Sequence, residues 1–386
     1  MGFPDATPPR WLVAGSTVVS ATLVVLAALP GVAAGHVKYV THDRHAGSAA
    51  RLFAAVLGDP TSVALVVAVA LGVVASVAAY LRWRPFGADV DAARRALAGY
   101  RDLLPWLVRL SVGLPLVGAG FAGYLFAPVV TPPVDVFGLG LGATALRLFG
   151  VTAGFLLLFG LATRLVAAAT LLCYLVALAA VHPLVLAFEY VPGLLAVALL
   201  GGGRPSADDV IETLAADERT AYAAVDPVYR RLVVPLRNRI QPYAPLVPVV
   251  LRLGLGVAFV YLGVTQKLLA PGPAVAVVEK YHLTAVVPVS PALWVFGAGV
   301  AESAVGLALA LGAFTRASAA VAFLLFTATL FGLPDDPVLA HVSLFGLVSA
   351  LLVTGAGPYA VDAVLGRGPT ADAAAPTADA TTEATD

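Results

Sequence analysis

Long apolar runs separated by short polar connections dominate the chain. A helix needs about 20 mostly apolar residues to cross the hydrocarbon of a bilayer. Ten runs of about that length lie at roughly 11–35, 61–81, 105–127, 141–162, 165–182, 184–203, 248–270, 292–312, 317–333 and 337–354. The pattern therefore predicts an all-α, polytopic transmembrane protein with about ten spans.

The later runs form two similar sets of four. Corresponding residues are 143 positions apart at the start of each set and 152 or 153 apart further on, as expected where a connecting loop differs in length. The matched pairs are Arg109 with Arg252, Ala127-Pro128 with Ala270-Pro271, Gly154 with Gly306, Gly160 with Gly312, Thr163-Arg164 with Thr315-Arg316, and Asp209 with Asp362. Many membrane proteins are built from such repeats, often with a site between them. We expect two tandem four-helix bundles after an N-terminal helix pair.

These patterns divide the chain into five parts. They are a two-span region with an outer loop and a basic inner loop (1–104), a first four-helix repeat (105–203), a cytoplasmic connecting segment (204–247), a second four-helix repeat (248–366), and a tail (367–386). The connecting segment is either a solvated linker or partly a helix on the inner leaflet, because it mixes basic and aliphatic residues. The tail is too polar to bury a core, which predicts disorder.

Arginine placement predicts the orientation, because cytoplasmic loops of membrane proteins are enriched in Lys and Arg. With the N-terminus inside, the outer loops hold only Lys38, Arg44, Arg51 and Lys280. The inner loops then hold Arg82, Arg84, Arg94, Arg95, Arg101, Arg164, Arg204, Arg219, Arg230, Arg231, Arg237, Arg239 and Arg316. We expect a multi-pass protein of the cell membrane with both termini cytoplasmic. The first span has a second interpretation as a cleaved signal peptide, although its apolar stretch is longer than usual for one.

Composition agrees with a membrane protein and excludes several other classes. The chain is 60% hydrophobic and 12% charged, with a mean hydropathy of +0.92, whereas soluble domains are about half apolar and a quarter charged. Its net charge of +0 offers no basic surface to a nucleic acid. A lone cysteine, Cys173, cannot form an internal disulfide. Three lysines against twenty arginines suggest a prokaryotic gene.

Ionisable residues at membrane depth are costly, so each is a candidate for function. Four arginines lie at the inner ends of spans, where they are expected to anchor the helices by reaching the lipid phosphates. They are Arg109, Arg164, Arg252 and Arg316.

Five other residues lie nearer the outer side. Arg147 and Glu189 fall at similar depths in the first repeat, roughly 8–9 Å down at 1.5 Å per residue, so an ion pair between them is possible. The second repeat holds Lys267, Glu302 and His341, and Glu189 aligns with His341 at an offset of 152. These three residues form the candidate polar cluster, with Glu302 the deepest. The alternative is that they only lock helices together through buried hydrogen bonds.

The sequence holds no recognisable cofactor motif. His36, His42 and His45 in the first outer loop could bind a transition metal, but their spacing fits a solvated polar loop at least as well. No pair of histidines faces across mid-membrane as haem ligation would require. A dinucleotide fingerprint, a phosphate loop and a CxxC pair are also missing from the sequence.

The second repeat resembles the DoxX family of small four-helix membrane proteins. The resemblance is carried by Arg252-Leu253-x-x-Gly256, Gly263 with Lys267, Glu302 with Gly306, Gly312-Ala313-Phe314-Thr315-Arg316, and Gly355-Ala356-Gly357-Pro358-Tyr359 leading to Asp362. The first repeat looks like a more degenerate copy, which aligns Gly150 with Glu302 and Val129 or a neighbour with Lys267. The polar positions are thus kept in the second copy only.

The resemblance implies a four-helix fold and suggests a redox context, since the family takes its name from a subunit of a thiosulfate:quinone oxidoreductase. Other members resemble components of membrane complexes that handle oxidative and thiol stress. We therefore expect a membrane subunit of a quinone-linked or thiol-stress redox assembly, with quinone as a possible ligand and other membrane or redox subunits as partners. Function does not follow from a fold alone, so a non-catalytic scaffold and a small-solute transporter stay open.

Overall fold

A computed structural model describes residues 47–83, 85–128, 142–225, 231, 233–333 and 338–364. The predicted first span (11–35), the three loop histidines His36, His42 and His45, and the tail (367–386) lie outside these residues. The described chain is helical throughout, with no strand, as the hydropathy pattern predicts.

The helices follow the predicted runs closely. The N-terminal region contains α3 (Ala49–Leu57), α4 (Pro60–Trp83), α5 (Gly87–Ala98) and η1 (Arg101–Leu103). The first set contains α6 (Leu104–Ala122), α7 (Gly142–Phe159), α8 (Thr163–Ala180), η3 (His182–Ala187) and α9 (Tyr190–Leu200). The connection contains α10 (Ala207–Ala216), α11 (Ala221–Val225), α12 (Val234–Ile240) and η5 (Gln241–Leu246). The second set contains α13 (Val247–Tyr261), η6 (Leu262–Leu269), α14 (Gly272–Lys280), η7 (Leu283–Ala285), α15 (Pro291–Leu311), α16 (Thr315–Gly332), α17 (Val338–Thr354) and α18 (Val361–Val364).

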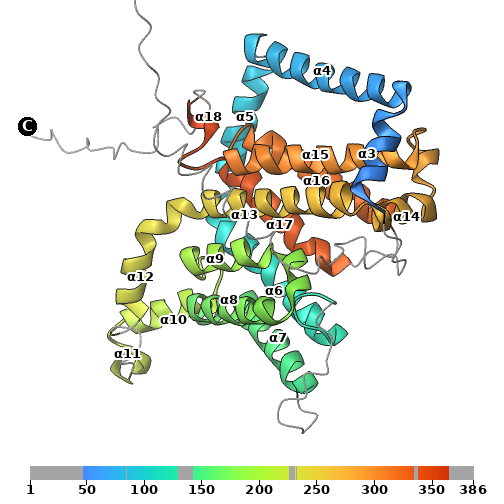
Figure 1. Cartoon of the computed structure of the whole chain (residues 1–386). Helices are drawn as coiled ribbons and strands as arrows, with labels where there is room; N and C mark the ends of the chain where they lie inside the picture. The colour runs from blue at the N-terminus through green and yellow to red at the C-terminus, as the bar shows by residue number, and fades with distance from the viewer. Residues whose placement is uncertain are drawn as a thin grey trace, which may run out of the picture.

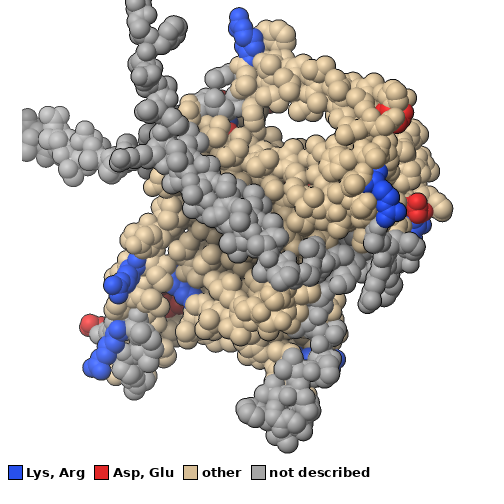
Figure 2. Space-filling view, in the orientation of Figure 1, with Lys and Arg blue, Asp and Glu red and all other residues tan. Residues whose placement is uncertain are grey.

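Several of these helices are suited to a bilayer. Six described helical segments are long and apolar enough to cross a membrane, and three shorter apolar helices accompany them. On the face drawn in Figure 2, most of the visible charged side chains lie toward the margins, and a broad uncharged surface separates them. The structure is that of a polytopic helical membrane protein.

The two sets of four pack in the same way. In the first set α6 lies along α7 and α8 along α9, and in the second set α13 lies along α15 and α16 along α17. The α6–α7 and α13–α15 pairs meet at glycines. A Cβ on Gly306 would lie 2.7 Å from the Gly256 carbonyl oxygen, and one on Gly154 would lie 2.8 Å from that of Gly113. Small residues let helix backbones approach closely in membranes, so these positions set both contacts.

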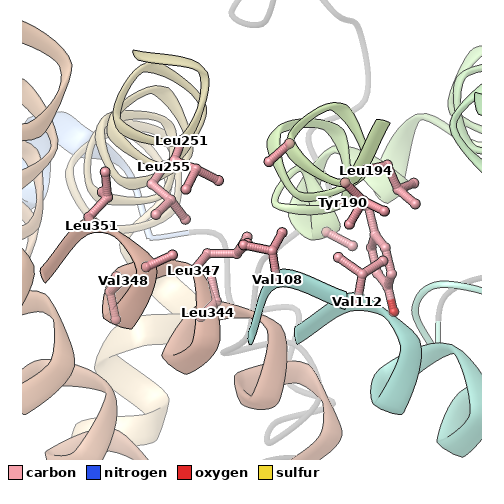
Figure 3. Packing of buried hydrophobic residues seen from close by; sticks show 14 of the residues in the cluster. Val108, Val112, Tyr190, Leu194, Leu251, Leu255, Leu344, Leu347, Val348 and Leu351 are labelled. Carbon is pink, nitrogen blue, oxygen red and sulfur yellow. The ribbon is translucent and has the colours of Figure 1, made fainter. Parts of the chain in front are cut away.

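The main core is one cluster that extends through both sets and across the contact between them. The last helix of each set packs on the first helix of the other, α9 on α13 and α17 on α6. Figure 3 shows side chains of these four helices meeting in one cluster. Equivalent positions of the two sets both contribute to the cluster. They are Val108 and Leu251, Val112 and Leu255 (each 143 apart), Tyr190 and Leu344, and Leu194 and Val348 (each 154 apart).

Reciprocal contacts support an approximate two-fold relation between the sets. Gly346 lies against Ser111, and Gly254 lies against Pro192. Ser111 and Gly254 are 143 positions apart, and Pro192 and Gly346 are 154 apart. The contact between α6 and α17 therefore recurs between α13 and α9 at equivalent positions.

The N-terminal helices lie against the second set, with α3 on α15 and α5 on α17, and two of the contacts join aromatic rings. Phe53 of α3 makes an edge-on ring contact with Phe296 of α15, and Tyr80 of α4 makes one with Phe314. Between these contacts α4 is largely exposed, and Figure 2 shows an opening between its middle and the rest of the protein. Figure 1 shows α4 running above α15.

Two predicted spans are not single α-helices. The run at 184–203 is divided into the short 3₁₀ segment η3 and the 11-residue α9, and Glu189 lies at the division. The run at 248–270 begins as α13 and continues as the π-helix η6. Hydropathy measures how far an apolar run extends but does not report hydrogen-bond pattern, so neither change was predicted.

The structure corrects one matched pair. Asp362 accepts hydrogen bonds from the backbone N–H groups of Phe314 and Thr315. In the first set Asp208, not Asp209, makes these bonds, with Ala162 and Thr163. The offset here is 154 rather than 153, and Asp209 instead pairs with the exposed Arg204 at 3.0 Å.

Candidate functional site

Two of the three predicted cluster residues form an ion pair. Lys267 Nζ lies 2.7 Å from Glu302 Oε2, joining η6 to α15. The side chains retain 17% and 25% of their exposure, so the pair is partly buried but reachable. Burying an ion pair between apolar helices has a desolvation cost, which only good geometry offsets. The pair is therefore an isolated polar contact in an apolar bundle.

The backbone around Lys267 is unusual. η6 is a π-helix of eight residues, whereas π-helical turns are rare and often occur at functional sites. Gly263 brings it close to α15, since a Cβ there would lie 2.6 Å from the Gly299 carbonyl oxygen. The buried side chains of Thr265 and Gln266 stand beside Lys267, and the Gln266 amide donates to the Thr265 hydroxyl at 3.1 Å. The π-helix therefore gathers polar side chains on one short segment.

The third predicted member, His341, has different neighbours. It lies on α17, is only 2% exposed, and its ring packs near those of Phe326 and Phe345 at centroid distances of 6.3 and 6.5 Å. None of the described hydrogen bonds or ion pairs joins His341 to Lys267 or Glu302. The structure thus assembles the lysine and the glutamate, with the histidine among aromatic rings.

Glu189 occupies a second polar point. It lies between η3 and α9, is 4% exposed, and accepts a 3.4 Å hydrogen bond from the Ser343 hydroxyl of α17. Residues 189 and 343 are 154 positions apart, so Ser343, rather than His341, is the counterpart of Glu189 in this part of the repeat. The bond therefore joins the two sets of helices.

The suggested Arg147–Glu189 ion pair is not found among the described residues. Arg147 is exposed on α7 and its guanidinium lies beside Gly123 at the end of α6. Depth along the sequence placed the two residues at one level, but it gave no information about which helix faces they occupy.

A small pocket opens beside Glu189 at the interface of the two sets. Its lining comes from the end of α6 and the following loop, from η3 and Glu189, and from the start of α17. The polar groups in the lining are Glu189, Tyr124, Tyr190 and Ser343, and the rest is mostly apolar. There is room for about one water molecule.

Tyr124 and Ser343 were missed at the sequence level, although offsets could have indicated both. Tyr124 is 143 positions before Lys267, the offset that relates α6 to α13, so it rather than Val129 is the first-set counterpart of the lysine. Gly120 and Gly263, which make equivalent close contacts, confirm this alignment. The position held by Lys267 in the second set is thus held by Tyr124 in the first.

The inner arginines bind protein rather than extending toward lipid. Arg252 is buried and donates to the carbonyl oxygens of Ala310 and Tyr359, each at 2.5 Å. Its counterpart Arg109 is also buried and donates to that of Pro205 at 2.5 Å.

Arg164 and Arg316 donate to the last carbonyls of neighbouring helices. Their acceptors include Ala198 of α9 and Leu352 of α17, respectively. Helix ends leave such carbonyls unsatisfied, and Arg252 likewise reaches the end of α15 at Ala310, whereas Arg109 binds a loop carbonyl between α9 and α10.

The described residues contain no group of three or more side chains that could hold a metal ion. The loop histidines His36, His42 and His45 lie outside that part of the chain, so the metal hypothesis there stays a prediction.

Fold and site define an integral membrane protein made of apolar helices, with isolated polar contacts inside the bundle. Residues 247–355 match the family model DoxX, so this segment of the chain is DoxX-like. The match covers the second set of helices, so the assignment of 105–203 as another copy stays a prediction. No curated protein and no solved structure matches the chain.

Proposed function

We propose that the protein is a membrane subunit of a quinone-linked redox assembly. The observation that carries the proposal is the Lys267–Glu302 ion pair, set at a π-helix inside the segment that matches DoxX. Ionisable residues within membrane helices commonly mark proton relays and ligand sites. The pair combines a donor with a proton acceptor in surroundings that suit an apolar ligand with a polar head.

A quinone head group fits this donor set. Its two carbonyl oxygens accept hydrogen bonds, and they take up protons when the ring is reduced. Lys267 would donate a hydrogen bond to one oxygen, and Glu302 would hold or pass on a proton at its carboxyl. The quinone itself supplies the two-electron chemistry when bound.

The electrons would come from a partner chain, because the sequence carries no recognisable cofactor motif. The connecting segment, which contains α10, α11 and α12, offers exposed apolar and basic side chains to such a partner, among them Val210, Leu214 and Leu236. We place this segment on the cytoplasmic side of the cell membrane, as the arginine distribution predicts.

The proposal is tested by purifying the full chain from membranes and extracting its lipids, with Glu302→Gln and Glu279→Gln made in parallel. Glu279 is an exposed acid on α14 and serves as the control. Quinone should co-purify with the wild type and with Glu279→Gln. Glu302→Gln should lose most of it, and thiosulfate- or thiol-dependent quinone reduction in membranes should fall at least tenfold.

Unchanged quinone content and unchanged reduction in Glu302→Gln would contradict the proposal. The ion pair would then be a helix lock, and assembly of partners on the connecting segment would become the better account. Flux of a small solute through proteoliposomes without any quinone dependence would instead favour a transporter.

A further inference from the structure

The buried carboxyl of Glu189 has no role in the quinone proposal. It belongs to the first set of helices, whereas Lys267 and Glu302 belong to the second. Its described side-chain partner is a hydroxyl, Ser343, at 3.4 Å. It also lines a pocket with room for about one water.

No compensating positive charge is found among the described residues that line the pocket beside Glu189. Among the described residues that line the pocket there is no lysine, arginine or histidine, and the other ionisable groups are Tyr124 and Tyr190. Arg147 is exposed and lies beside Gly123. His341, two positions from Ser343 on α17, packs its ring near phenylalanines.

A buried carboxylate without a cation is costly by several kcal/mol, and such a group takes up a proton instead. The pocket meanwhile lies at one end of the helix interface. Its loop residues Phe126, Ala127 and Pro128, together with Leu186 of η3 and Leu339 of α17, all belong to the end that the arginine distribution predicts to face outward. A water held there would join the carboxyl to that side.

We propose that Glu189 is a proton-exchange site, which binds one proton and exchanges it with a water in the pocket between the two sets of helices. In the forward step the carboxylic acid O–H bond breaks and the proton passes to the water, which carries it outward. The carboxylate that remains accepts the hydrogen bond of the Ser343 hydroxyl. The reverse step restores the neutral acid.

Infrared difference spectroscopy of the full chain in lipid at pH 7 tests this. The spectrum of the wild type minus that of Glu189→Gln should contain the C=O stretching band of one carboxylic acid, and transfer to D₂O should shift that band. Glu279→Gln, the exposed control, should remove carboxylate bands and leave the acid band in place. Ser343→Ala should move the acid band to a different frequency, which gives a readout that does not depend on how well Glu189→Gln folds.

Two outcomes overturn the proposal. Carboxylate bands in place of the acid band would show that Glu189 is ionised, and an acid band that does not respond to D₂O would show that its proton does not exchange. The band should persist in Glu302→Gln, so failure of this proposal and failure of the quinone proposal give different results.

Discussion

At the scale of single residues, a carboxylate binds the start of one helix in each set, and it is partly buried in the first set and buried in the second. Asp208 and Asp362 each accept hydrogen bonds from the first two N–H groups of a helix, those of α8 and α16. Each also donates its own backbone N–H to a glycine carbonyl, Gly160 or Gly312, at 2.8 and 2.9 Å. Both glycines have left-handed φ values, 68° and 67°. The arrangement is the same in the two sets.

Asp362→Ala should therefore destabilise the protein. It leaves the N–H groups of Phe314 and Thr315 without their acceptor, and an unsatisfied buried polar group costs about 1–3 kcal/mol. Denaturant unfolding in detergent, followed by circular dichroism, measures the effect. Asp209→Ala is the control and should cost less than about 1 kcal/mol, because that carboxylate pairs with an exposed arginine. An equal loss of stability in the two variants would show that the hydrogen bonds of Asp362 contribute no more than the exposed ion pair of Asp209.

At this scale the sequence located the polar residues but not their partners. Periodicity and depth singled out Lys267, Glu302 and Glu189. A one-residue error in the offset nevertheless matched Asp209 with Asp362, and a two-residue error made His341 the counterpart of Glu189. Both errors arise because polar candidates lie close together in the sequence, as with Asp208 and Asp209 or His341 and Ser343, and only the three-dimensional contacts distinguish between them.

At the scale of helices, close approach of backbones sets the arrangement of each bundle. Gly256 of α13 and Gly306 of α15 face each other, and added Cβ atoms would lie 2.6 and 2.7 Å from the facing carbonyl oxygens. Without a hydrophobic force between helices in lipid, such contacts supply much of the association energy. The position of η6, and with it Lys267, depends on this contact because η6 continues α13 directly.

Gly306→Ala should weaken the α13–α15 contact. The new Cβ would meet backbone atoms that cannot move aside, an overpacking that costs typically about 1–3 kcal/mol. Gly297→Ala on the same helix has nothing within 4 Å of its Cβ, so it should be neutral or stabilising by up to about 1 kcal/mol. Thermal unfolding of the two variants side by side distinguishes these outcomes. If Gly306→Ala were as stable as Gly297→Ala, the close α13–α15 contact would be contradicted.

The sequence predicted helices better than it predicted their irregularities. Apolar length identified every described span, since a bilayer imposes that length. The division at Glu189 and the π-helix at Lys267 depend on tertiary packing, and hydropathy averages over both. Both irregularities lie at the polar residues of the two candidate sites.

At the scale of the whole molecule, the two sets of helices share one core. The last helix of each set packs on the first helix of the other, α17 on α6 and α9 on α13, and an approximate two-fold axis relates the two contacts. The offsets of 143, 152 and 153 indicated that the two sets are similar, but they did not show that the last helix of each set packs on the first helix of the other. A sequence repeat shows that two segments are similar, but it does not show which of their helices are in contact.

Orientation in the membrane can be checked by cysteine labelling in a Cys173→Ala background. Glu279→Cys should react with an impermeant maleimide in intact cells, because arginine placement puts α14 outside. Arg219→Cys, in the connecting segment, should react only after lysis. Both sites are exposed in the described structure, so the reverse pattern would mean that the protein has the opposite orientation.

The central claim is that the Lys267–Glu302 pair binds a quinone head group. It is tested most directly by calorimetric titration of a short-chain quinone into the full chain in nanodiscs. Wild type and Glu279→Gln should bind alike, and Glu302→Gln should bind at least tenfold more weakly, a difference of about 1.4 kcal/mol. Equal affinity in all three proteins, or no binding to the wild type, would contradict the claim.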